Sequence, residues 1–120
     1  MSRRPPRLSD LRAAWWAHRA LRAARRGLAA GELRNVAIPR PGSLPATAAR
    51  GVEAILRRRP HTCLEGALVR QRWLANQGIA RDVVIGVTAP RGGFEAHAWL
   101  AQRHDSRSPQ AWRELTRLVP

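Results

Sequence analysis

The chain has 120 residues, a hydrophobic content of 44% and a formal net charge of +14. This length suits one domain with a modest core, and the hydrophobic content excludes general disorder. The sequence has 1 cysteine, which excludes an internal disulfide and a cysteine-rich zinc site, and we expect neither a metal nor a cofactor. No run approaches the ~18 apolar residues of a membrane span, and no apolar segment follows the first arginines. We therefore expect a cytoplasmic protein.

Arginine supplies all of the 22 Lys+Arg positions, and these arginines are spread along the whole chain. This distribution indicates a coding bias toward Arg and Ala as much as selection for an anionic partner. The positive field should still attract acidic peptides or nucleic acid non-specifically. Because no nucleic-acid-binding motif accompanies the charge, we expect no specific nucleic-acid partner.

The N-terminal part predicts a long helix that starts at Ser9, where Ser9 can cap it, and stops at Gly31. Trp15 and Trp16 are adjacent, so on a helix they point about 100° apart. Both can belong to a broad core-facing surface, or one is left to bind a partner protein. Prolines then mark a linker. We expect an N-terminal extension and Pro-rich linker over 1–44 and a core over 45–120, in one compact domain.

A second helix is expected from Pro45 to about Arg58, because Pro60 biases the residue before it away from helical geometry. The arginines that end with Arg59 are typical of a solvated helix terminus. Since they directly precede Cys63, Arg59 is also a candidate for holding an acidic substrate segment.

A third helix is predicted from Cys63 to about Gln77. Thr62 and Glu65 form a capping-box pattern, which places Cys63 at the first helical position. Unpaired backbone N–H groups and the helix dipole favour a thiolate there, which is how nucleophilic cysteines are commonly activated. The alternative is that Cys63 is a small buried apolar residue.

The segment 81–87 is rich in β-branched residues and predicts a strand that is covered on both faces. A second strand is expected over 94–101, with His97 and Trp99 on one face. The tail from Pro109 is compatible with a short helix or a final strand. Helices with a hairpin indicate an α+β fold, in which Cys63 and His97 can meet as nucleophile and base.

Four segments together resemble the transglutaminase-like cysteine peptidases of lasso-peptide biosynthesis, the B proteins, across about residues 60–101. The segments are CLEGAL at 63–68, LANQGI at 74–79, VVIGV at 83–87 and FEAHAW at 94–99. The resemblance implies a transglutaminase-like (papain-like) core, with N-terminal helices packed on a small antiparallel sheet. The short chain resembles the stand-alone B2 form, which lacks a leader-recognition domain.

The resemblance also implies a function. Such enzymes remove the leader from a ribosomally made precursor peptide, which a separate B1 protein presents, before a macrolactam synthetase (the C protein) closes the ring. It assigns Cys63 as nucleophile, His97 as base, and an Asp beyond His97 as the third member. Asp105 is the candidate for that role, with a turn cap as its alternative and Glu114 as a distant substitute. Trp99 is expected to wall the site or to fill the core.

Three other functions stay open at this point. A related Cys-His-Asp acyl transferase or amidase would use the same Cys63 and His97 on another acceptor. A non-catalytic adaptor would hold the precursor and the synthetase together. A basic nucleic-acid module would lose binding steeply with salt.

Overall fold

The structure is a computed structural model that describes residues 5–88, 95–101 and 113–120. The chain forms two compact units, Met1–His61 and Thr62–Pro120, which are called the N-terminal unit and the C-terminal unit below. Each unit is described by itself. The division expected at residue 45 stays a prediction.

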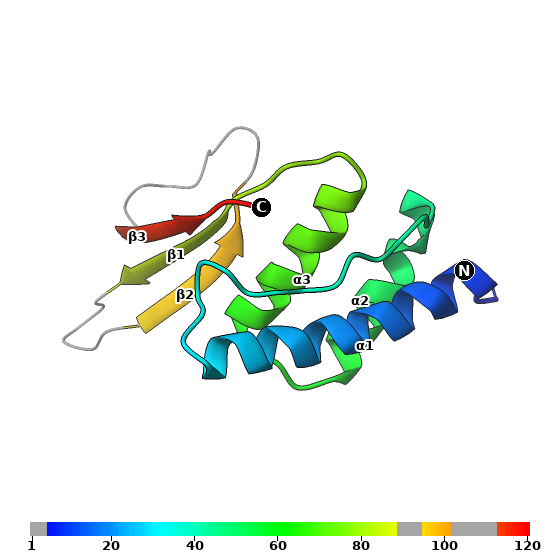
Figure 1. Cartoon of the computed structure of the whole chain (residues 1–120), viewed down its shortest axis with the longest axis horizontal. Coiled ribbons are helices and arrows are strands. Elements are labelled where there is room, and N and C mark those ends of the chain that lie inside the picture. Colours follow the sequence, from blue (N-terminus) through cyan, green and yellow to red (C-terminus); the bar gives the residue numbers. More distant parts are fainter. Residues whose placement is uncertain (1–4, 89–94, 102–112) are drawn as a thin grey trace. The chain divides into compact units, whose positions relative to one another are not determined.

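The N-terminal unit is a pair of helices, α1 (Leu8–Ala29) and α2 (Ala49–Arg58), with a 3-10 turn, η1 (Ala46–Ala48), before the second (Figure 1). The face that α1 buries is made largely of small residues: Ala13, Ala17, Ala20 and Ala24. Small side chains allow two helix backbones to approach closely. At Gly51 of α2, an added Cβ would lie 2.9 Å from the carbonyl carbon of Asp10, which shows how near the backbones are.

The ends of α1 follow from local hydrogen bonds. The helix begins at Leu8, one residue earlier than expected, so the prediction that Ser9 caps it is wrong. The carboxylate of Asp10 reaches back instead and accepts the N–H of Arg7 at 2.9 Å, and Arg50 lies 3.7 Å from the same carboxylate. Gly31 follows the last turn with φ +77°, the left-handed geometry that glycine adopts at helix ends, so it stops the helix as predicted.

The helix predicted from Pro45 to about Arg58 is confirmed, with η1 as its first turn. Arg59 leaves helical geometry at φ −102° and ψ 129°, as expected for the residue before Pro60.

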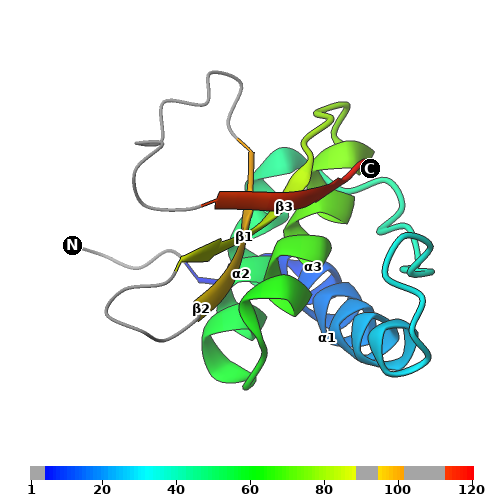
Figure 2. The ribbon, with the colours of Figure 1, turned by 90° about the vertical axis from the view of Figure 1, so that its left-hand side faces the viewer.

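The C-terminal unit consists of α3 (Cys63–Asn76) and the strands β1 (Val83–Thr88), β2 (Glu95–Leu100) and β3 (Arg113–Leu118). The strands form an antiparallel sheet in the order β2-β1-β3, and α3 packs against β2 and β1 (Figure 2). The tail is therefore a strand, and it pairs with β1 at the edge opposite β2. The α+β prediction is confirmed, with three helices and this antiparallel sheet in the described residues.

The central strand β1 carries the core of the sheet. Val83 and Val84 are both buried, and neighbouring strand residues point to opposite faces, so β1 is covered on both faces as predicted. The register pairs Gly86 with His97 and Val84 with Trp99. His97 and Trp99 therefore lie on the same face of the sheet, as expected.

The pairings of β1 with its two neighbouring strands differ in regularity. The pairing of β1 with β3 shifts between Ile85 and Gly86, so that Glu114 lies opposite Gly86 and Arg117 opposite Val84. The shift places Glu114 and Arg117 on one face although they are three residues apart.

None of the helices in the described part of the chain is long and apolar enough to cross a membrane.

Candidate active site

Cys63 stands at the first position of α3, as the capping pattern predicts. Thr62 is the N-cap: its Oγ1 accepts the N–H of Glu65 at 3.1 Å, and its own N–H donates to Glu65 Oε1 at 2.9 Å. The reciprocal pair fixes where the helix begins and therefore where the thiol lies. The Cys63 side chain is exposed, which excludes the alternative of a small buried apolar residue.

The thiol lies against the edge strand of the sheet. The backbone N–H of Ala98 in β2 donates to Cys63 Sγ at 3.4 Å. Because β2 pairs with β1 on its other side, this N–H points out of the sheet at the free side of the strand. The contact brings the nucleophile candidate beside the residue that directly follows His97, so α3 and β2 hold the two predicted residues in one region.

His97 is half-buried and is held by its neighbour on the same face of β2. Its imidazole stacks on the indole of Trp99, with ring centroids 6.0 Å apart and an interplanar angle of 21°. Trp99 is half-buried too, so it both packs and forms a flat wall beside the imidazole. A role for Trp99 in lining the site stays a prediction.

The third member of the predicted triad cannot be placed, because Asp105 lies outside the described residues. Glu114, its predicted substitute, lies across Gly86 from His97, two strands away. Its carboxylate accepts Arg117 Nε at 2.7 Å. Glu114 is therefore engaged with Arg117 rather than with the imidazole.

The remaining predicted residues belong to the N-terminal unit. Trp16 is 5% exposed and Trp15 is 64% exposed, so one tryptophan is core and the other faces outward, as one of the two alternatives required. Arg59 is exposed, and its carbonyl oxygen lies 2.8 Å from Nδ1 of His61. A substrate-holding role for Arg59 stays a prediction.

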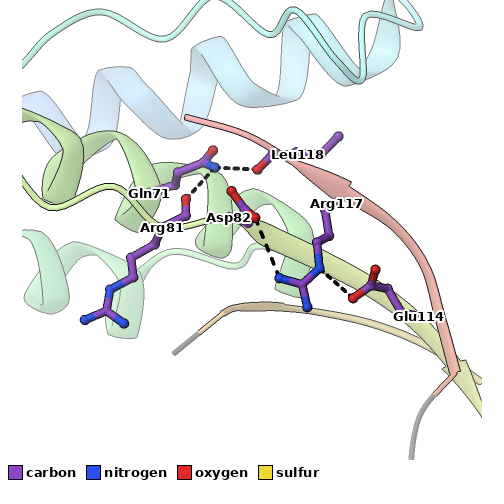
Figure 3. Close-up of polar contacts among 6 residues, drawn as sticks. All are labelled: Gln71, Arg81, Asp82, Glu114, Arg117 and Leu118. Carbon is purple, nitrogen blue, oxygen red and sulfur yellow. Dashed lines mark hydrogen bonds and ion pairs between the residues drawn. The ribbon is translucent and has the colours of Figure 1, made fainter. Parts of the chain in front are cut away.

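A polar cluster at the end of the sheet was not predicted as a unit. Arg117 contacts both Asp82 and Glu114 (Figure 3). Its Nη1 lies 3.6 Å from Asp82 Oδ2. Gln71 of α3 donates from Nε2 to the carbonyl oxygens of Arg81 at 2.9 Å and Leu118 at 2.7 Å (Figure 3). Gln71 follows Ala67 and Leu68 at spacings of four and three residues, which places its amide on a buried face of α3, and this pattern was the signal for the role. Gln71 ties the helix to the ends of β1 and β3, and so supports the position of Cys63 at the other end of α3.

The described residues contain no group of three or more His, Cys, Asp and Glu side chains placed to hold a metal ion.

Comparison with protein families gives a match. A family model described as "Transglutaminase-like superfamily" matches residues 7–119, which is nearly the whole chain and includes both units. No curated protein and no solved structure matches the chain significantly.

Proposed function

We propose that this chain, which belongs to the transglutaminase-like superfamily, is a cysteine peptidase that removes the leader from a ribosomally made lasso-peptide precursor. The observation that carries the proposal is the exposed thiol of Cys63 at the capped start of α3, 3.4 Å from the backbone nitrogen next to His97. The segments that resemble the B proteins at 63–68, 74–79, 83–87 and 94–99 support the choice of substrate.

The reaction proceeds in two steps. The sulfur of Cys63 attacks the carbonyl carbon of the last leader residue, while His97 takes the thiol proton. The C–N bond breaks, His97 protonates the leaving amine of the core peptide, and the leader remains as a thioester on Cys63. Water then attacks the thioester with His97 as base, which releases the leader carboxylate and restores the thiol.

The start of α3 offers donors for the oxyanion that forms in each step. Thr62 already accepts the N–H of Glu65 on its side chain and the N–H of Gly66 on its carbonyl oxygen. The donors that remain at the helix start, among the contacts of the described residues, are the backbone N–H groups of Cys63 and Leu64. Such groups at a helix N-terminus stabilise developing negative charge.

A carboxylate that orients the imidazole would complete the machinery. We assign this role to Asp105, because Glu114 is engaged with Arg117. The orienting residue holds the tautomer in which the ring nitrogen that faces the thiol can accept a proton.

The proposed partners are the precursor peptide, a separate B1 protein that presents the leader, and the macrolactam synthetase that takes the cleaved core. Presentation by a partner raises the local concentration of the scissile bond without changing the chemistry.

The test is cleavage of a purified precursor in the presence of its recognition protein, followed by mass spectrometry. Wild-type protein should release leader and core, and Cys63→Ala should release neither while it keeps the far-ultraviolet spectrum of the wild type. Cleavage by Cys63→Ala at the wild-type rate would overturn the proposal and favour an adaptor. A parallel reaction with an added primary amine separates hydrolysis from acyl transfer, because only an acyl transferase converts the leader mainly into its amide.

A further inference from the structure

A groove with a basic rim runs along α1 in the N-terminal unit. One of its walls is formed by Trp15, Arg19, Arg22 and Arg26, which follow one another at spacings of three or four residues and so share one side of the helix. The other wall is apolar and is formed by the segment 37–39, in which Ala37 is exposed, Pro39 is half-buried and Ile38 is buried. The N-terminal unit alone supplies all residues of this groove.

Contacts between α1 and the segment 36–39 fix the shape of the groove. The indole Nε1 of the buried Trp16 donates to the carbonyl oxygen of Pro39 at 2.8 Å. Further along α1, an added Cβ at Gly27 would lie 2.8 Å from Val36 Cγ1, so the segment rests directly on the helix. These contacts fix the apolar wall to α1, and a ligand therefore meets a groove that is already formed.

The exposed side chains of the groove have a consistent chemistry. Trp15 is 64% exposed, and one face of its ring stacks on His18 with centroids 5.8 Å apart, which leaves the other face for a ligand. Arg19, Arg22 and Arg26 are exposed, and no carboxylate within the described residues pairs with any of them. An exposed tryptophan beside unpaired arginines is typical of residues that dominate binding energy at protein interfaces.

We propose that this groove binds an acidic, extended segment of a separate polypeptide, with carboxylates on the three arginines and an apolar side chain between Trp15 and Pro39. A second copy of the chain is disfavoured as the occupant because its own net charge is +14. A nucleic acid is disfavoured because the arginines span only roughly 10 Å of helix and face an aliphatic wall.

The binding itself follows from the N-terminal unit and does not depend on Cys63. The identity of the occupant rests on the proposed function, which makes it a segment of the B1 leader-recognition protein. The groove would then be the place where that partner docks to deliver the precursor.

The test uses the full chain and a short fluorescein-labelled peptide of glutamates with one central leucine, followed by fluorescence anisotropy. The glutamate peptide should bind at least about tenfold more tightly than the same peptide with glutamine in place of glutamate. Trp15→Ala and Arg22→Glu should each weaken binding by about tenfold or more, because the groove is lined by both residues. Arg57→Glu makes the same change of charge on α2, outside the groove, and should weaken binding less than about twofold.

Equal losses in Arg22→Glu and Arg57→Glu would overturn the proposal, since only net charge would matter. If an oligonucleotide binds more tightly than the glutamate peptide, and Trp15→Ala weakens both to the same extent, the occupant of the groove is a nucleic acid rather than a polypeptide. Self-association in sedimentation that Trp15→Ala abolishes would replace it by a second copy.

Cys63→Ala separates this proposal from the proposed function, because it should bind the peptide as the wild type does. If the protein cleaves its precursor but does not bind the peptide, the proposal about the groove fails and the proposed function stands. If the protein binds the peptide but does not cleave its precursor, the proposed function fails and the proposal about the groove stands.

Discussion

The two units differ in the residues from which they build their cores. In the N-terminal unit, α1 meets α2 through alanines and through Gly51, so two helix backbones lie close together and the long arginines point outward. Among the described residues the largest fully buried side chains are valines: Val52 in the N-terminal unit, and Val69, Val83 and Val84 on a helix and a strand of the C-terminal unit. The close packing of α1 and α2 leaves the arginines of the N-terminal unit on an outer surface that can bind a partner. The packing of α3 on the sheet instead fixes the positions of individual side chains, such as Cys63 and His97, that can take part in a reaction.

This difference predicts which changes each unit tolerates. The N-terminal unit should be sensitive to one added methyl group at the helix contact, because backbones cannot move apart locally. The C-terminal unit should be sensitive to the loss of polar atoms that tie α3 to the strands, and its chemistry to the loss of single side chains.

The largest effect is expected at His97. Replacing it by alanine removes the base that accepts the thiol proton, and cleavage should slow by about 10³-fold. Single-turnover cleavage measures this loss, and the circular dichroism of the variant should match the wild type because His97 is only half-buried. Cleavage within about threefold of the wild type would remove His97 from the mechanism.

Gly51→Ala should destabilise the protein by about 3 kcal/mol, because its methyl group would press on the backbone of Asp10. Chemical denaturation followed by circular dichroism measures the change. Gly31→Ala is the control: a Cβ there meets nothing within 4 Å, and only the positive φ opposes it, at a cost of about 1 kcal/mol. Equal losses in the two variants would contradict the close contact of the two helices.

Gln71→Leu should destabilise by about 2 kcal/mol, because it leaves the carbonyl oxygens of Arg81 and Leu118 without their donor. Gln77→Leu, the same change just beyond α3, should cost less than half as much, because Gln77 is only half-buried whereas Gln71 is buried. If the two variants unfold at the same denaturant concentration, Gln71 does not tie the helix to the strands.

The smallest effect is expected at Glu114. Glu114→Gln breaks a partly exposed ion pair with Arg117 and should change the cleavage rate less than about twofold. Asp105→Asn is its counterpart and should slow cleavage by at least about 10²-fold if Asp105 orients the imidazole. A slow Glu114→Gln with a normal Asp105→Asn would reverse the assignment of the third residue.

Much of the fold could be predicted because its signals are local. The reciprocal contacts of Thr62 and Glu65 lie within one helical turn, so the start of α3 and the place of Cys63 were readable from the sequence. The end of α1 at Gly31 and the departure of Arg59 before Pro60 likewise depend on adjacent residues.

The features that the sequence left open depend on contacts between distant residues. Trp15 and Trp16 have the same local pattern, and the choice between them is made by Pro39, whose carbonyl oxygen binds Trp16. The tail becomes a strand because β1 offers it a free edge, which its own residues do not encode. The register that sets Glu114 opposite Gly86 has the same origin.

The central claim is that Cys63 forms a covalent bond with the leader during cleavage, and the intact mass of the protein measures this most directly. Samples quenched in acid during turnover should contain protein whose mass is increased by the acyl group of the leader. This adduct should map to the peptide that carries Cys63. His97→Ala should lower the rate at which this adduct forms. Precursor cleavage that proceeds at the wild-type rate in Cys63→Ala, with no adduct on the wild type, would contradict the account.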